Sequence, residues 1–220
     1  AGCRILQWGN QMKKTLLSYG ILCVLIPAAI VCGAVLFADR QYAWISLCVT
    51  VLSCIPFFLR FERREENAKR MILLACMTAL SVLGRIAFAP IPAFKPVTAM
   101  VVITAMYFGS EAGFLTGSLS AVISNFYFGQ GPWTPFQMFS WGILGFIAGI
   151  IARQLRENKV VLAIYGIVSG VLYSFLMDVW TVLSADGYFN FSRYLAAVAA
   201  AVAGFLLLNN AGMILSPHPI

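Results

Sequence analysis

Residues 112–152 read AGFLTGSLSAVISNFYFGQGPWTPFQMFSWGILGFIAGIIA and contain no Asp, Glu, Lys, Arg or His. A membrane-spanning helix needs about 20 mostly apolar residues. In lipid, every backbone polar group must be paired inside the protein, so apolar runs of this length should be helical. Glycines and prolines interrupt the run near its middle. The stretch therefore predicts two spanning helices, 112–128 and 135–152, joined by a tight connection.

The rest of the chain has the same character. It is 61% hydrophobic and only 10% charged, whereas soluble domains carry roughly 25% charged residues. Lipid must therefore cover much of the surface, which predicts an all-α integral membrane protein rather than a soluble enzyme. Eight spans are expected, of which the fourth is too short to cross upright: 15–37, 42–59, 70–89, 97–108, 112–128, 135–152, 159–184 and 192–209.

Lysine and arginine residues test this count. With a cytoplasmic N-terminus and alternating spans, the inside segments hold Arg4, Lys13, Lys14, Arg60, Arg63, Arg64, Lys69, Arg70, Arg153, Arg156 and Lys159. The outside segments hold only Arg40, Lys95 and Arg193. This asymmetry agrees with the positive-inside rule and supports an even number of spans. The net charge of +7 is thus explained by topology, and no clustered basic face predicts nucleic-acid binding.

Charge also divides the chain. We expect an N-terminal two-helix membrane unit over 1–59, a charged cytoplasmic linker over 60–70 and a six-helix core over 71–209. Residues 210–220 form an uncharged tail, which is interpreted as non-native. Met12-Lys13-Lys14 resembles a natural start, so residues 1–11 are interpreted as a translation artefact.

Motifs for catalysis are missing from the sequence. The six cysteines form no CxxC pair, the single histidine is His218 in the tail, and there is no GxxxxGK[ST]. A metal site, a histidine-based triad or ATP hydrolysis by this chain itself is therefore not expected. We predict no cofactor and no enzymatic activity.

Small residues recur every four positions on several predicted helices. Ala75 and Ala79 form an AxxxA pair, and similar spacings occur at Gly113, Gly117 and Ala121, at Gly145 and Gly149, and at Gly166, Gly170 and Ser174. Residues four apart share one helix face, and small ones let two backbones approach closely. The pattern fits internal packing or a docking face for another membrane protein, and the spacing alone leaves both open.

Polar side chains in costly places suggest a binding site at the outer end of the bundle. Arg85 and Asp178 sit late in apolar spans, and the connection FGQGPWTPFQ, 128–137, is rich in polar and aromatic groups. Intramembrane ionisable groups are functional candidates. The alternatives are a rigid turn with an aromatic belt, snorkelling, or a structural Arg85–Asp178 pair. The predicted substrate-binding residues are Arg85, Lys95, Asn125, Gln130, Trp133, Thr134, Gln137, Trp141, Asp178 and Trp180.

Four segments together resemble a known family. They are the AxxxA span that leads into Arg85, FKPVTA at 94–99, YFGSEAGFLTGSLSAVISNFYFGQGPWTPFQM at 107–138, and WGILGFIAG at 141–149. They are similar to the substrate-binding S component of energy-coupling factor (ECF) vitamin transporters, over about residues 69–200. The GPWTPFQM segment is the most specific part and is closest to members linked to cobalamin or its precursors.

The resemblance implies a six-helix S-component core, here preceded by two extra transmembrane helices. It implies capture of a vitamin or vitamin precursor on the outer face of a bacterial plasma membrane. It also implies docking, through Ala75 and Ala79, on a transmembrane coupling (T) component that works with two ATPase subunits for uptake. The alternative is a membrane scaffold or regulatory protein without a transported ligand.

Overall fold

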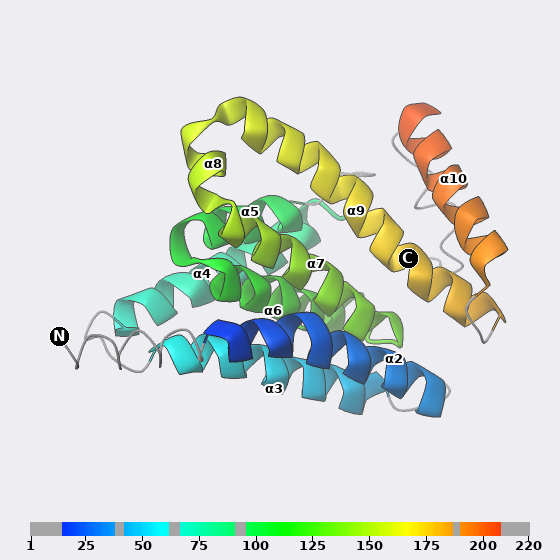
Figure 1. Ribbon diagram of the computed structural model, residues 1–220, viewed down its shortest axis with the longest axis horizontal. Helices are drawn as coiled ribbons and strands as arrows, with labels where there is room; N and C mark the ends of the chain where they lie inside the picture. The colour runs from blue at the N-terminus through cyan, green and yellow to red at the C-terminus, as the bar shows by residue number, and fades with distance from the viewer. Residues whose placement is uncertain (1–14, 38–41, 62–66, 91–95, 187–189, 208–220) are drawn as a thin grey trace.

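The computed structural model describes residues 15–37, 42–61, 67–90, 96–186 and 190–207 (Figure 1). Every regular element in these ranges is helical, which confirms the all-α prediction. Residues 15–20 are helical and continue into a π-helical turn. In chain order the elements are η1 (Ile21–Leu25), α2 (Ile26–Phe37), α3 (Tyr42–Phe61), α4 (Asn67–Ala87), α5 (Val97–Phe108), α6 (Ser110–Phe128), α7 (Trp133–Ile150), α8 (Ala152–Glu157), α9 (Lys159–Asp186) and α10 (Phe191–Leu207).

Each expected span contains a helix, but the helices differ in whether they are long and apolar enough to cross a membrane. Three stretches of the described chain are long and apolar enough to span a membrane: Thr15–Cys32, Ala68–Ala87 and Lys159–Leu183. Two shorter apolar helices lie at Trp44–Pro56 and Val97–Phe108. Neither α6 nor α7 reaches the mean hydropathy of those three stretches, although apart from Ser110 and Glu111 their residues come from the uncharged stretch 112–152. The count of eight spans therefore stays a prediction.

The pair α6 and α7 lies at the centre of the bundle (Figure 1), and its two backbones touch through glycines. A Cβ added to Gly117 would lie 2.5 Å from the Trp141 carbonyl carbon, and one added to Gly113 would lie 2.7 Å from the Gly145 oxygen. One added to Gly149 would lie 2.3 Å from the Ser110 Cα. The small residues of these two helices therefore serve internal packing.

The small residues of α9 are different. A Cβ added to Gly166 or Gly170 would meet nothing within 4 Å, so this face of α9 is open in the described chain. On α4, Ala75 and Ala79 are likewise exposed. One sequence pattern thus has two structural outcomes, which depend on whether a second helix lies against the small residues.

Buried hydroxyls explain why α6 is less apolar than a lipid-facing helix. The Ser118 hydroxyl donates to the Met138 carbonyl of α7 at 3.1 Å, and Ser53 of α3 donates to the Ser118 oxygen at 3.5 Å. These serine side chains form hydrogen bonds with neighbouring helices instead of facing lipid. Helix α6 can therefore contain more polar residues than a helix that lipid surrounds.

The two N-terminal helices pack on the core rather than apart from it. Leu22, Ile26 and Val49 belong to the same buried apolar cluster as Phe114 and Met138 of α6 and α7. Helix α3 lies against α6 and α7 and is joined to η1 and α2 by direct packing. The first 61 residues therefore contribute to one shared core where the structure describes them.

The expected linker over 60–70 is helical at both ends. Helix α3 continues to Phe61, and α4 begins at Asn67. The middle of this segment, with Arg63 and Arg64, lies outside the described residues, as do Lys95, the start at Met12 and the tail 210–220.

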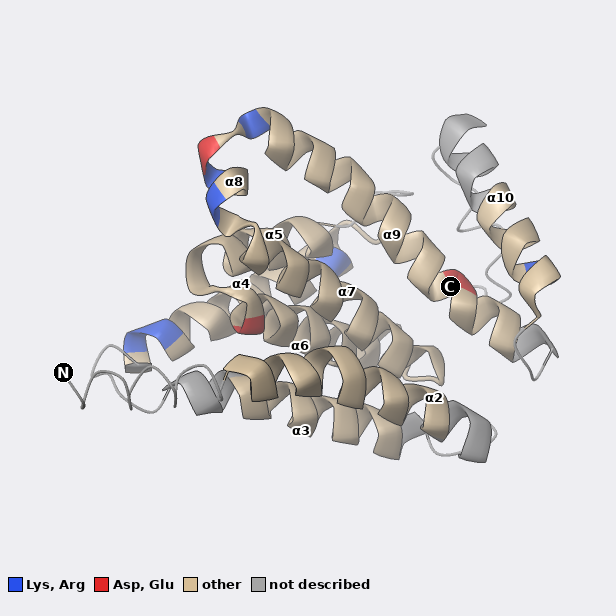
Figure 2. Cartoon of the chain, in the orientation of Figure 1, with Lys and Arg blue, Asp and Glu red and all other residues tan. Residues whose placement is uncertain are grey.

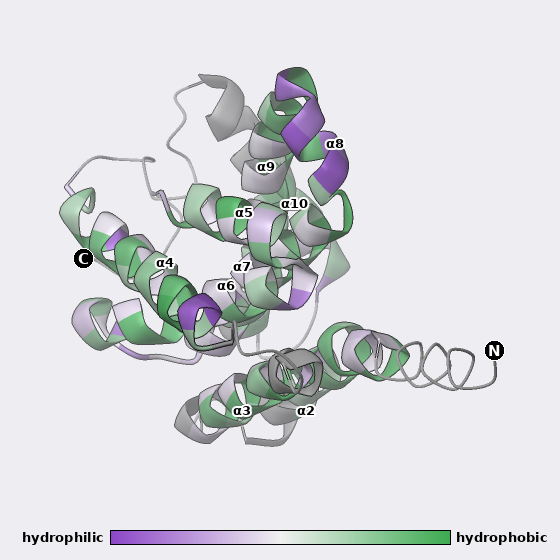
Figure 3. Ribbon diagram, turned by 90° about the vertical axis from the view of Figure 1, so that its left-hand side faces the viewer, coloured by the Kyte–Doolittle hydropathy of each residue, from purple (hydrophilic) through white to green (hydrophobic). Residues whose placement is uncertain are grey.

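Charged segments gather at one end of the molecule. In Figure 2 the blue Lys and Arg positions in the first turn of α4 and in α8 lie toward the left of the view, and α8 is strongly hydrophilic in Figure 3. At the other side, α10 packs mainly against α9.

The α6–α7 contact gives a first testable result. We expect Gly117→Ala to lower the free energy of unfolding by about 1–3 kcal/mol, the usual cost of overpacking, because the new methyl would collide with backbone that cannot move aside. Gly170→Ala, on the open face of α9, is the matched control and should change stability little. Thermal unfolding in detergent measures both. Equal midpoints for the two variants would contradict the close contact.

Candidate functional site

Arg85 occupies the last turn of α4 and is only 7% exposed. Its Nη1 donates to the Ser124 hydroxyl and, at 2.8 Å, to the Asn125 Oδ1. The Ser124 hydroxyl itself donates to the Ser120 carbonyl at 2.6 Å, one turn earlier in α6. The proton of Ser124 is thereby turned away from the guanidinium, and its lone pairs face Arg85.

Asn125, with 1% exposure, connects α4 to α7. Its Oδ1 accepts from Arg85, while its Nδ2 donates at 2.9 Å both to Thr134 Oγ1 and to Gln137 Oε1. All three contacts fit only one orientation of the amide, because the nitrogen faces two acceptors and the oxygen faces a cation.

The chain of donors continues through the connection between α6 and α7. Thr134 Oγ1 donates to Gln130 Oε1 at 3.1 Å, and Gln130 Nε2 donates to the Val122 carbonyl at 2.8 Å. The Gly131 amide donates to Thr134 Oγ1 at 3.3 Å. Gly129, with φ near +100°, takes the left-handed conformation that favours glycine and lets the chain turn here. We name Arg85, Ser124, Asn125, Gln130, Thr134 and Gln137 the Arg85 cluster.

Aromatic rings enclose the cluster. The Arg85 Cζ lies 4.8 Å from the Phe128 ring centre and 4.9 Å from that of Trp141. Trp141 is stacked on Tyr173 of α9, with centroids 5.1 Å apart and planes inclined by 14°. Tyr173 also lies beside Gln137 and Arg85. The rings favour the guanidinium through cation–π attraction while they exclude water.

The structure thus brings together six of the predicted residues: Arg85, Asn125, Gln130, Thr134, Gln137 and Trp141. Trp133 lies next to the cluster, with its ring over Gly131, since a Cβ on that glycine would be 2.3 Å from the ring. Lys95 falls outside the described residues. Trp180 packs on Phe136 of α7 with centroids 5.4 Å apart and forms no hydrogen bond with the described side chains of the cluster.

Asp178 does not pair with Arg85. Its Oδ2 is buried and has no hydrogen-bond partner in the described chain, and Arg85 instead donates to the two neutral side chains of α6. The structural Arg85–Asp178 pair that the sequence allowed is therefore wrong.

Sequence reasoning missed Ser124, Phe128 and Tyr173 as neighbours of Arg85. Serine is common in buried helices, and nothing in its spacing separates a hydroxyl that faces arginine from one that bonds its own helix. The segment 133–137, expected as a connection, is the first turn of α7, with Pro132 at its N-cap. Proline is tolerated in the first turn, where no intrahelical N–H bond is needed.

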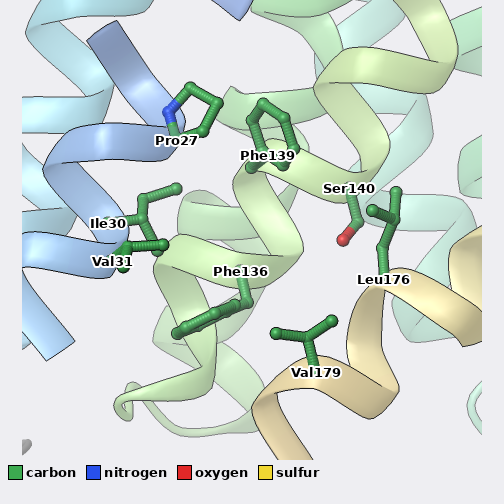
Figure 4. Close-up of a pocket in the computed structure, with 8 residues that line it drawn as sticks. All are labelled: Pro27, Ile30, Val31, Phe136, Phe139, Ser140, Leu176 and Val179. Carbon is green, nitrogen blue, oxygen red and sulfur yellow. The ribbon is translucent and has the colours of Figure 1, made fainter. Parts of the chain in front are cut away.

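A separate cavity of about 120 Å³ lies between α2, α7 and α9 (Figure 4). Its walls are apolar apart from Ser140, and Figure 4 shows side chains from all three helices turned toward one space. Its lining residues are Pro27, Ile30, Val31, Phe136, Phe139, Ser140, Leu176 and Val179. None of the Arg85 cluster lines it, so it offers no polar recognition.

The exposed AxxxA face lies on the same helix as Arg85. Ala75 and Ala79 are exposed together with Ile72, 62% exposed, and Leu83, 61% exposed. At the start of α4, Arg70 donates to the Phe108 carbonyl and lies over the Phe108 ring, which fixes this end of the helix against α5. The apolar face is therefore rigidly presented.

Comparison with known proteins places these features in context. A family model described as "ECF-type riboflavin transporter, S component" matches residues 65–217. A UPF0397 protein from Aliivibrio fischeri (strain MJ11) is 29% identical over 168 residues, which is 66% of this chain and 90% of that protein. UPF0397 proteins from Vibrio atlanticus and Aliivibrio salmonicida are 28% and 30% identical over the same length. No solved structure matches.

Proposed function

Because the chain belongs to the ECF-type riboflavin transporter S-component family, we propose that it captures a vitamin or vitamin precursor at the Arg85 cluster and delivers it for ATP-driven uptake. The observation that carries this proposal is a buried set of polar and aromatic side chains drawn from α4, α6 and α7 at one end of the bundle. Such convergence of polar groups between apolar walls is typical of small-molecule sites.

The family's description and the sequence resemblance favour different vitamins. The family is named for riboflavin, whereas the GPWTPFQM segment resembles members linked to cobalamin. The site combines the aromatic rings of Trp141 and Tyr173 with the amide of Gln137, a combination that suits a flat, polar ring system such as riboflavin. Riboflavin is therefore the first ligand to test, and cobalamin is the second.

Calorimetry on the detergent-purified full chain tests the assignment. We expect Gln137→Ala to weaken binding of the vitamin by about 1–3 kcal/mol, the scale of a lost buried polar contact. Trp133→Ala should have an effect of similar size, because its ring covers the turn beside the cluster. Gln154→Ala, an exposed glutamine of α8, is the control. Unchanged affinity in both test variants would move the site away from this turn.

We also propose that the Arg85 cluster faces outward and the N-terminus is cytoplasmic. Helix α4 runs from Lys69 and Arg70 to Arg85, and α7 runs from the cluster to the basic helix α8, so the cluster and the basic segments lie at opposite ends of these helices. The positive-inside rule then puts the basic ends in the cytoplasm.

Labelling of single cysteines in a cysteine-free background measures this orientation. We expect an impermeant maleimide to leave Asn158→Cys and Glu65→Cys unlabelled in intact cells and to label both after permeabilisation. Ser192→Cys, at the exposed start of α10, should be labelled in intact cells. Rapid labelling of position 158 or 65 from outside would invert the proposed topology. Position 65 lies outside the described residues.

Partner association is the remaining part of the proposal. We propose that Ala75 and Ala79 dock on the T component, which works with two ATPase subunits. Their exposure on α4 supports this, because small residues without an internal neighbour let a partner helix approach closely.

A further inference from the structure

Arg85 carries a buried positive charge that has no negative partner among the described side chains. Arg85 is 7% exposed, and in the described chain its hydrogen bonds go to a serine hydroxyl and an asparagine amide. Neutral acceptors and ring faces offset only part of the cost of burying a cation. The described side chains therefore compensate the guanidinium incompletely.

The carboxylates whose side chains the structure describes do not supply the missing charge. Glu157 pairs with Arg153 at 3.0 Å on α8. Glu111 lies in the first turn of α6 and accepts from Ser110 at 3.1 Å, about 21 Å along the helix from Asn125 at 1.5 Å per residue. Asp178 makes no hydrogen bond through Oδ2 and forms no ion pair with Arg85.

The guanidinium also has a free donor on a defined edge. Nη1 is used by Ser124 and Asn125, while Nε is buried and has no hydrogen-bond partner in the described chain. The N–H of Nε and one N–H of Nη2 point the same way in every guanidinium, and this fork matches two oxygens of a carboxylate or phosphate.

The surrounding hydrogen bonds hold this edge in place. The donors run in one direction, from Arg85 to Asn125, then to Thr134 and Gln130, and finally to the Val122 carbonyl. Because the side-chain oxygens of Asn125, Thr134 and Gln130 already accept hydrogen bonds within this run, none of them is left to turn toward the Nε edge. The position is thus prearranged for a group from outside the chain.

We propose that the solute bound by this protein carries a carboxylate or phosphate group, which the Nε edge of Arg85 receives. The inference rests on the proposed function and narrows its substrate to anionic vitamins, precursors or their phosphate esters. A bound anion supplies both the missing charge and the missing acceptor.

Molecules retained by the purified full chain provide the test. Wild type, Arg85→Gln, Arg85→Lys and Arg153→Gln are purified identically, and the water-soluble and lipid extracts are identified by mass spectrometry. We expect a water-soluble molecule with a carboxylate or phosphate in the wild type and in Arg153→Gln. Arg85→Gln should retain at least about tenfold less of it, with Arg85→Lys between the two because lysine keeps the charge but lacks the fork.

Asn125→Asp keeps the test decisive if Arg85→Gln does not fold. The new carboxylate would lie where Oδ1 now lies, 2.8 Å from Nη1, and would neutralise Arg85 from within. We expect it to fold and to lose the anionic solute.

Each other outcome counts against the inference. A retained neutral molecule, or an anionic one kept equally by Arg85→Gln, would overturn the inference and leave the proposed function intact. An Arg85-dependent phospholipid would overturn it as well, since the arginine would then bind a headgroup. Riboflavin and riboflavin 5′-phosphate differ by one phosphate group and can be compared by calorimetry. Equal affinities would reject the requirement for an anionic group and would leave the proposed function intact. Absence of any retained molecule, together with no binding of either flavin or of cobalamin, would remove both proposals.

Discussion

Leucine at both position 75 and position 79 is expected to abolish recovery of the T component and the ATPase subunits with the tagged protein. Both alanines are exposed on α4, and the larger side chains would hold a partner helix away from the α4 backbone. Solute affinity should stay within about twofold, because the two positions lie roughly two and three turns before Arg85. Co-purification and calorimetry on the same preparations measure the two results.

Ala163→Leu serves as the control for this pair, since Ala163 is exposed on α9 and outside the AxxxA face. It should leave the complex intact. Normal recovery of the partners with the double leucine variant would reject the docking role, and loss of solute binding in it would show that the change had damaged the fold instead.

Asn125→Leu is expected to lower the free energy of unfolding by about 3 kcal/mol or more and to remove solute binding. Leucine has the same branched arrangement of four side-chain heavy atoms as asparagine, so it keeps the shape of the side chain while it removes both polar groups. The variant leaves buried Arg85 with Ser124 as its remaining side-chain acceptor, and it removes the donor to Thr134 and Gln137. Truncating one partner of a buried charged group costs far more than an exposed contact.

Ser120→Ala is the matched control for Asn125→Leu. Ser120 is fully buried, yet its hydroxyl has no hydrogen-bond partner in the described chain. Its removal should leave stability unchanged or slightly higher, while its carbonyl still accepts from Ser124. Chemical denaturation in detergent compares the two variants. If Ser120→Ala lowered the free energy of unfolding as much as Asn125→Leu does, any change in α6 would be destabilising. The hydrogen bonds of the Arg85 cluster would then make no particular contribution to stability.

The composition of the Arg85 cluster was largely predictable because its members are conspicuous. An arginine in an apolar span and the amides near it have a high free energy in lipid unless they form hydrogen bonds with one another. We could therefore expect these side chains to lie together. Ser124 and Tyr173 were not predictable in this way. A hydroxyl satisfies itself on its own helix, and the rotation of α9 that turns Tyr173 onto Trp141 is set by packing between distant segments.

The apolar runs predicted where the helices lie in the sequence, but they did not predict which helices pack against one another. Glycine spacing is the same on α6, α7 and α9, yet a Cβ on Gly145 would lie 2.5 Å from the Gly113 oxygen while Gly166 has open space. Which helix meets which small face depends on contacts between distant segments, and no local pattern encodes it. Likewise, the prolines near Trp133 suggested an irregular connection, although one of them sits in a helix's first turn.

The close contact of α6 and α7 through their glycines has a consequence for membrane insertion. Neither helix reaches the mean hydropathy of the three stretches that could cross a membrane by length and composition, and alone each would carry serine and amide groups into hydrocarbon without partners. As a closed hairpin, the two helices satisfy some of these groups mutually, as in the bond from Ser118 to the Met138 carbonyl. We therefore expect α6 and α7 to enter lipid as a pair, and a variant that keeps the two helices apart to be inserted less efficiently.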